Sequence, residues 1–277
     1  MLTSYAIPLV RIAKDKVVKT LRHVTAGLPQ LDIHTLSEDW ALAAALESTW
    51  GLLSESLGLK PSQWLDAQGE RMYGAVMALA TRFDLVDVIR EDDDIVAETE
   101  ILAIRKPHAW AVTRFSVGGR VKAEVWLLTS FIRRSQRGSN KKFSKVRDLW
   151  LAEDVNGVII DDLLDRHHAE KTAEIDVAPA MDYEVNRIQD FNTADFLYFK
   201  NFVRIAKAAE WRANRGQPIR LNATRECFYF GNVEDGETMQ ARVGRIGDAT
   251  QTELTDVNGR RLFLSRAVTP VVTIAQR

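Results

Sequence analysis

A dense group of cations between residues 133 and 147 is the strongest chemical signal in the sequence. This segment holds seven basic residues and no acidic residue before Asp148. Such a run suits an anionic partner, because opposite charges give charge-assisted contacts and faster encounter. A solvated loop explains the same composition equally well. The basic residues are Arg133, Arg134, Arg137, Lys141, Lys142, Lys145 and Arg147.

The five histidines and the single cysteine do not have the spacing of a metal or disulfide site. No two histidines lie at the spacing that places two ligands on one helical face. We expect the adjacent His167 and His168 to point to different faces in either regular structure, so they should not share a ligand. Cys227 has no partner for an internal disulfide, and no C-x-x-C pair is present. The sequence therefore predicts no metal site.

Phosphate-binding and nucleophile motifs are also missing from the sequence. It contains no Gly-x-Gly-x-x-Gly, no Walker loop and no nucleophile elbow. Chemistry that depends on a nucleotide or an organic redox cofactor is therefore disfavoured.

Composition and charge fit a folded chain with no general affinity for nucleic acid or membranes. Hydrophobic residues make up 46% and charged residues 27%, near the values for folded domains. The formal net charge of -1 gives no global field, and the aromatic residues beside the basic segment resemble packing residues rather than a stacking surface. We expect no nucleic acid partner and no membrane partner. Residues 1–20 lack a signal-peptide pattern, so we expect a cytoplasmic location.

Residues 36–133 predict a long helix followed by a meander of strands. Acidic groups follow Ser37 at the expected helix start, and the apolar stretch 40–57 ends at Gly58. That stretch is apolar on more than one face, so we expect it to be buried on most sides. β-branched and aromatic residues predict strands at 73–83, 95–104, 110–117 and 121–133. The acidic cluster 91–94 is interpreted as a solvated connection between strands.

The same order returns after a polar connector. A strand is predicted at 181–188, then a helix over 193–212 with Asn192 as its cap. Further strands are predicted at 224–230, 238–247, 250–256 and 261–267, and Asn258-Gly259 is a strong turn signal. Within the connector, Leu163-Leu164 could pack as a short helix or strand.

These elements predict an α+β protein of two similar halves, each a buried helix against an antiparallel sheet. The predicted division is residues 1–150, a connector over 151–180, and residues 181–277. A buried helix enclosed by a curved sheet, occurring twice, resembles the double hot dog fold.

Several phrases resemble the family of the bifunctional acyltransferase/decarboxylase of leinamycin biosynthesis and related double hot dog proteins of biosynthetic gene clusters. They span most of the chain, and it is their combination that carries the resemblance. The phrases are Leu36-Ser37-Glu38 with Trp40, Gly69-Glu70-Arg71-Met72-Tyr73, Ala123-Glu124-Val125-Trp126-Leu127-Leu128-Thr129-Ser130-Phe131, Arg133, Gly138-Ser139-Asn140, Asp190-Phe191-Asn192 and Phe196-Leu197-Tyr198-Phe199.

The resemblance implies a substrate carried as a thioester on coenzyme A or an acyl carrier protein. The implied reaction is decarboxylation of a malonyl-type group, transfer of the acyl group to a carrier protein, or both. No cofactor is implied beyond the coenzyme A or phosphopantetheine of the substrate. Partners would be acyl-CoA or an acyl carrier protein, and a homodimer is left open. The basic segment, with Arg133, Arg137, Lys141 and Lys142, would then suit coenzyme A phosphates or the acidic carrier surface.

By the same resemblance, Tyr73 is the candidate acyl acceptor. A phenol has an ordinary pKa near ~10, so it needs a nearby cation or strong donor to act as a nucleophile at neutral pH. Arg71 or another basic group could supply this. An ordinary packing role for a tyrosine at a strand start is the alternative.

Decarboxylation of a thioester builds negative charge on its oxygen, which calls for aimed N–H or neutral side-chain donors. The helix starts near Ser37 and Asn192 are candidates, and Ser139-Asn140 could supply a second kind of donor. Asn192 is also a candidate cap, and Ser139-Asn140 a candidate polar turn.

Two other functions remain open at this stage. A hot dog dehydratase or thioesterase would need a carboxylate or histidine at the thioester, and Asp190 or His34 would then matter most. His34 also suits a structural hydrogen bond beside the helix start. A module that binds acyl carrier protein through the basic segment, without catalysis, is the non-enzymatic alternative.

Overall fold

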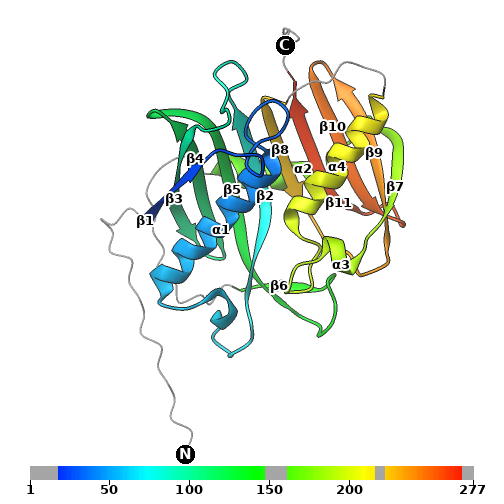
Figure 1. Cartoon of the computed structure of the whole chain (residues 1–277). Coiled ribbons are helices and arrows are strands. Elements are labelled where there is room, and N and C mark those ends of the chain that lie inside the picture. Colours follow the sequence, from blue (N-terminus) through cyan, green and yellow to red (C-terminus); the bar gives the residue numbers. More distant parts are fainter. Residues whose placement is uncertain (1–17, 147–160, 216–221, 270–277) are drawn as a thin grey trace, which may run out of the picture.

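A continuous antiparallel sheet of eleven strands organises the protein (Figure 1). The computed structural model describes residues 18–146, 161–215 and 222–269. Strand order is β1-β3-β4-β5-β2-β8-β11-β10-β9-β7, with β6 paired to β5. The strands of the first half are β1 (Val18–Thr25), β2 (Tyr73–Phe83), β3 (Asp94–Arg105), β4 (His108–Val117), β5 (Arg120–Arg134) and β6 (Phe143–Lys145). Those of the second half are β7 (Ala178–Glu184), β8 (Thr224–Tyr229), β9 (Thr238–Ile246), β10 (Ala249–Asp256) and β11 (Arg261–Val268).

Two long helices lie side by side on one face of this sheet (Figure 1). They are α1 (Glu38–Leu57) in the first half and α4 (Phe199–Ala213) in the second, and both pack into the same apolar core. A shorter helix, α2 (Asp161–Glu170), packs Leu163 and Leu164 on the opposite face. The remaining helices are α3 (Arg187–Asp190) and a 3-10 turn at Pro61–Gln63. No helix in the described part of the chain is long and apolar enough to span a membrane.

The two halves share a local device as well as an element order. The loop before α1 is pinned by an isolated bridge between Leu31 and Leu36, and the loop before α4 by one between Phe191 and Leu197. This repeat supports the duplicated plan expected from the sequence. The division at residues 150 and 180 stays a prediction.

Most predicted elements are confirmed within a residue or two. Ser37 caps α1 by accepting from the N–H of Trp40 at 3.4 Å, and Gly58 ends the helix in the left-handed region at φ +61°. The strands of both meanders lie where β-branched and aromatic residues predicted them. Acidic residues 91–93 lie in the connection from β2 to β3, as expected, and Asp94 is the first residue of β3. The connector forms α2, although residues 151–160 and Arg147 lie outside the described residues.

The start of the second half differs from the prediction. Helix α4 begins at Phe199 rather than 193, and Tyr198, not Asn192, is its N-cap. The Oδ1 atom of Asn192 accepts from the N–H groups of Ala194 and Phe196, a local turn that competes with a helix. Asp195 has φ +61°, which a helix forbids. The predicted strand 181–188 was likewise too long, since β7 ends at Glu184 and α3 follows.

A buried arginine joins the two halves at the seam between β2 and β8. The side chain of Arg225 is 0% exposed, and its Nε donates to Glu38 on α1 at 3.1 Å. Its two terminal nitrogens donate to both carboxylate oxygens of Glu210 on α4, at 2.7 and 3.0 Å. Burial alone raises the pKa of Glu38, but the charges of Arg225 and Lys207 lower it overall, so the carboxylate stays ionised.

Removing the charge of Arg225 should destabilise the fold strongly. In Arg225→Met, the carboxylates of Glu38 and Glu210 stay buried without their main partner, and we expect a loss of about 3–5 kcal/mol. Urea unfolding measures the change. The matched control is Arg22→Ala, which removes an ion pair with the exposed Glu47 and should cost less than about 1 kcal/mol. Similar losses in the two variants would contradict the role of Arg225.

Gly74 on β2 lets the ring of Trp50 cross the strand closely. A Cβ atom at Gly74 would lie 2.2 Å from Cη2 of Trp50. Gly74→Ala should therefore destabilise the protein by about 1–3 kcal/mol through overpacking. Gly51→Ala on α1 is the control, because no atom lies within 4 Å of its added Cβ, and helix propensity should make it stabilising by about 0.5–1 kcal/mol. Thermal unfolding of both variants checks the opposite signs.

Candidate functional site

The sheet splits at one end of the seam between its halves. Strands β2 and β8 pair only between Ala78↔Phe228 and Arg82↔Thr224. The preceding part of β2, Tyr73–Met77, has no partner on β8, and Phe230 after β8 donates its N–H to Leu262 instead. A cavity of about 400 Å³ occupies the split, lined by both diverging edges.

The cavity is apolar toward the two long helices. Leu46 and Trp50 of α1, together with Phe199 and Phe202 of α4, form its wall there. Tyr229 also lines it and donates its hydroxyl to the carbonyl of Phe199 at 3.2 Å. This wall offers aromatic and aliphatic contact surface to an apolar group.

Tyr73 lines the cavity at the start of β2, and an arginine holds its hydroxyl. Nη1 of Arg134 donates to the Tyr73 oxygen at 3.3 Å. The guanidinium also lies 4.1 Å from the ring centroid of Phe196, which meets the Tyr73 ring edge-on at 5.1 Å. Arg71, one of the basic groups considered for the phenol, lies 5.1 Å from the ring centroid of Tyr73. The sequence did not distinguish Arg134 from its basic neighbours.

Arg134 also ties this edge of the cavity to the second half. Its Nη2 donates to the carbonyl of Ala194 at 2.6 Å and to Oδ1 of Asn140 at 2.8 Å. Asn192 lines the cavity on the same loop as Ala194. Because its Oδ1 is occupied by backbone N–H groups of the loop, the amide nitrogen is the donor that Asn192 retains.

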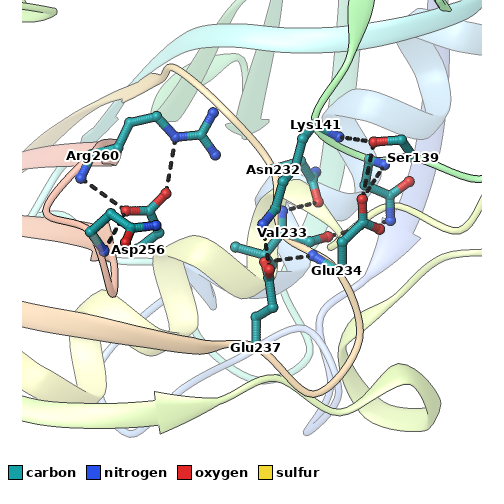
Figure 2. A network of polar contacts seen from close by, with 10 residues as sticks. Ser139, Lys141, Asn232, Val233, Glu234, Glu237, Asp256 and Arg260 are labelled. Carbon is teal, nitrogen blue, oxygen red and sulfur yellow. Dashed lines mark hydrogen bonds and ion pairs between the residues drawn. The ribbon is translucent and has the colours of Figure 1, made fainter. Parts of the chain in front are cut away.

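The turn at Ser139 and Asn140 joins the two halves through hydrogen bonds to Glu234 (Figure 2). Ser139 Oγ and the Asn140 N–H both donate to Glu234, at 3.2 and 2.8 Å. Asn140 is 2% exposed and donates Nδ2 to the carbonyl of Val233 at 3.3 Å. Lys141 forms an ion pair with Glu237. Neither Ser139 nor Asn140 lines the cavity in the described structure, so their proposed role as thioester donors stays a prediction.

The other predicted binding residues lie away from the cavity or outside its lining. Arg133 donates to Asp66 at 2.6 Å, and Arg137 and Lys142 are exposed. His34 and Ser37 lie in the loop before α1, outside the cavity lining. The functional roles of these residues stay predictions.

On the α2 side, two adjacent histidines enter the site from the connector. His167 is buried and His168 is exposed, as expected for neighbours on different faces of a helix. Both nevertheless line the cavity, with ring centroids 5.8 Å apart. Lys145 and Lys171 line the same cavity. Sequence spacing alone did not indicate this site, because the connector showed little periodicity.

Buried polar atoms without partners lie beside these cations. His167 donates Nε2–H to the carbonyl of Tyr229 at 2.9 Å, and its Nδ1 has no partner. Ser130 Oγ on β5 and Nδ1 of His108 on β4, in register with Ser130, also have none. Burial lowers the pKa of His167, and the charges of His168 and Lys145 lower it further.

No aspartate, glutamate or cysteine is among the described lining residues. Asp190, the carboxylate considered for a hydrolase or dehydratase, is fully buried and accepts from Tyr183, Arg204 and the N–H of Asn186. Within the described residues, no group of three or more acidic, histidine or cysteine side chains could hold a metal ion.

Comparison with known proteins identifies the fold. An acyl-ACP thioesterase from Bacteroides thetaiotaomicron superposes with a TM-score of 0.63 at 10% identity, covering 91% of this chain and 97% of that chain. The chain has a hot dog fold. A 12:0-ACP thioesterase from Umbellularia californica gives the same TM-score, identity and coverage of both chains. No family model matches the sequence, and neither does any curated protein. The expected α+β hot dog architecture is confirmed at this level.

His108 should make stability depend on pH. Burial, followed by the charge of Lys145, lowers the pKa of His108 to about 4, from an ordinary value near ~6.5. Between these values the unfolded chain binds a proton that the folded chain does not, so folding stability falls as pH drops through this window. His108→Gln should show a smaller loss of stability between pH 7 and pH 4, measured by urea unfolding.

The exposed His23 supplies the control for this measurement. His23→Gln should keep the pH slope of the parent protein. An unchanged slope in His108→Gln would contradict a neutral, buried His108.

Proposed function

We propose that the protein is an acyl-thioester enzyme that decarboxylates a malonyl-type substrate, transfers its acyl group to a carrier protein, or does both. The observation that carries the proposal is the chemistry of the cavity. A tyrosine hydroxyl bound by a guanidinium lies beside an apolar chamber with no carboxylate in its described lining. Two of the similar solved structures are thioesterases named for acyl-ACP substrates, which supports a thioester substrate.

In this proposal Tyr73 is the acyl acceptor. The N–H of Arg134 favours negative charge on the phenol oxygen, which then attacks the thioester carbonyl. The carbon–sulfur bond breaks, and the leaving thiolate takes up the proton that the phenol gives up. Loss of carbon dioxide leaves an enolate, to whose negative oxygen the amide of Asn192 would donate, and the enolate carbon then takes up a proton from water. The apolar wall favours decarboxylation, because placing a charged carboxylate against it carries a large desolvation cost, whereas neutral carbon dioxide carries little.

Hydrolysis is a second candidate, favoured by one specific observation. The unpartnered Nδ1 of His167 is the acceptor nitrogen of the neutral ring and could take a proton from water. Asp190 is less suited to this role, because it is not among the described lining residues and its carboxylate is already held by Tyr183 and Arg204. A module that binds a carrier protein without catalysis, through Arg137, Lys141 and Lys142, is the non-enzymatic alternative.

The architecture proposed for this function is a fused pair of hot dog units with one working site between them. The two helices α1 and α4, each against its own part of the sheet, support this arrangement. A cytoplasmic location, and a carrier protein or acyl-CoA as partner, belong to the same proposal.

Incubation with malonyl-CoA and methylmalonyl-CoA tests the proposal, with and without an acyl carrier protein. Free thiol, carbon dioxide and intact protein mass are followed. We expect an acyl adduct on the protein that is absent from Tyr73→Phe. Tyr198→Phe is the matched control, because Tyr198 also lines the cavity and should leave the adduct unchanged.

Other outcomes identify the alternatives. Thiol release without a carrier, unaffected in Tyr73→Phe and lost in His167→Gln, would favour the thioesterase. Absence of turnover, with carrier binding abolished by reversing the charges of Arg137, Lys141 and Lys142, would favour the binding module. Either result contradicts acyl transfer through Tyr73.

A further inference from the structure

Apart from Lys145, the basic side chains that line the cavity lie outside the segment that the sequence singled out for anion binding. Lys145 on β6, His168 on α2 and Lys171 just after α2 all line it and are exposed, so they mark where it opens to solvent. Of the basic residues of the segment 133–147, only Lys145 is among the described lining residues. With no acidic side chain in that lining, the opening favours an anion.

Two buried polar groups lie inward of this opening without partners. Ser130 is 1% exposed and His167 is 7% exposed, and both line the cavity. The Oγ of Ser130 can donate and accept, whereas the Nδ1 of neutral His167 accepts. A buried polar group without a partner is unfavourable, so a ligand whose amide groups supply hydrogen-bond partners would be favoured here.

We propose that this opening admits a phosphopantetheine arm, with its phosphate at His168 and Lys171 and its amides beside Ser130 and His167. The inference rests on the proposed function, in which the substrate is an acyl thioester. The order of groups along the cavity matches the order along the arm. The arm has an anionic phosphate at one end, amides along its length, and an apolar acyl group at the other end. That acyl group would lie on the wall formed by Trp50 and Phe202.

Coenzyme A and a loaded carrier protein both contain the 4′-phosphopantetheine arm, so the first test uses the arm alone. Binding of 4′-phosphopantetheine and of pantetheine is measured by calorimetry at low ionic strength, because exposed charges are screened by salt. We expect 4′-phosphopantetheine to bind about tenfold more tightly, since charge-assisted contacts add to neutral ones. The double variant His168→Gln/Lys171→Gln should bind both compounds equally.

A matched control removes the same kind of charge elsewhere. Arg137→Gln/Lys142→Gln changes two exposed cations outside the cavity lining and should retain the phosphate preference. Loss of the preference in this control, or its survival in the His168/Lys171 variant, would overturn the proposal.

Ser130→Ala tests the inner part of the proposed site, where the amides of the arm would lie. It should weaken both 4′-phosphopantetheine and pantetheine by a similar factor and leave their ratio unchanged. An unchanged affinity for both compounds would show that Ser130 does not contact the arm.

Two further ligands distinguish whether the arm arrives as part of coenzyme A or on a carrier protein. Coenzyme A that binds more tightly than 4′-phosphopantetheine would indicate recognition of the nucleotide as well. Equal affinity for coenzyme A, with tighter binding of a carrier protein, would indicate that the arm arrives on the carrier. None of these measurements needs turnover, so a failed decarboxylation assay leaves the arm site testable by itself.

Discussion

The buried charge of Arg225 is the constraint on which the arrangement of the two halves depends. Its guanidinium cannot be deprotonated and is fully enclosed, so it must be paired. The partners are one carboxylate from each long helix, Glu38 and Glu210, with Ser265 on β11 adding a contact at 2.7 Å. This arrangement fixes α1 and α4 relative to β8, and with them the apolar wall of the cavity.

The cavity follows from where that pairing holds and where it stops. Near Arg225, strands β2 and β8 form a regular ladder. Beyond Ala78 and Phe228 the strands diverge, and the cavity, lined by aromatic side chains and by residues of α2, lies between them in place of a ladder. Contacts of Arg134 with Ala194 and of Asn140 with Glu234 join the two halves where β2 and β8 are unpaired.

The sequence predicted the fold better than it predicted the site, and particular residues explain why. Regular strands and α1 follow local signals such as Ser37, Gly58 and alternating β-branched residues, which act over a few positions. The start of α4 was misplaced because Asn192 can cap either a helix or a turn, and only tertiary contacts of the loop decide. Tyr73 and Asn192 were found through the resemblance, and both line the cavity. His167, His168 and Ser130 were not, because they meet only when the connector folds back over the sheet.

The two corresponding loops, one before α1 and one before α4, lie at opposite ends of the β2–β8 seam and have different structural roles. At the other end of the β2–β8 seam, the N–H of Phe83 donates to the carbonyl of Ala223 and extends the pairing. The loop before α1 therefore lies beside a closed seam and contributes the cap and ion pair of Ser37 and Glu38. Its counterpart before α4 lies at the open end and lines the chamber. A duplicated unit can in this way divide the roles of its loops: the loop of one copy supports the joint between the halves, while the loop of the other copy contributes to the surface that faces a ligand.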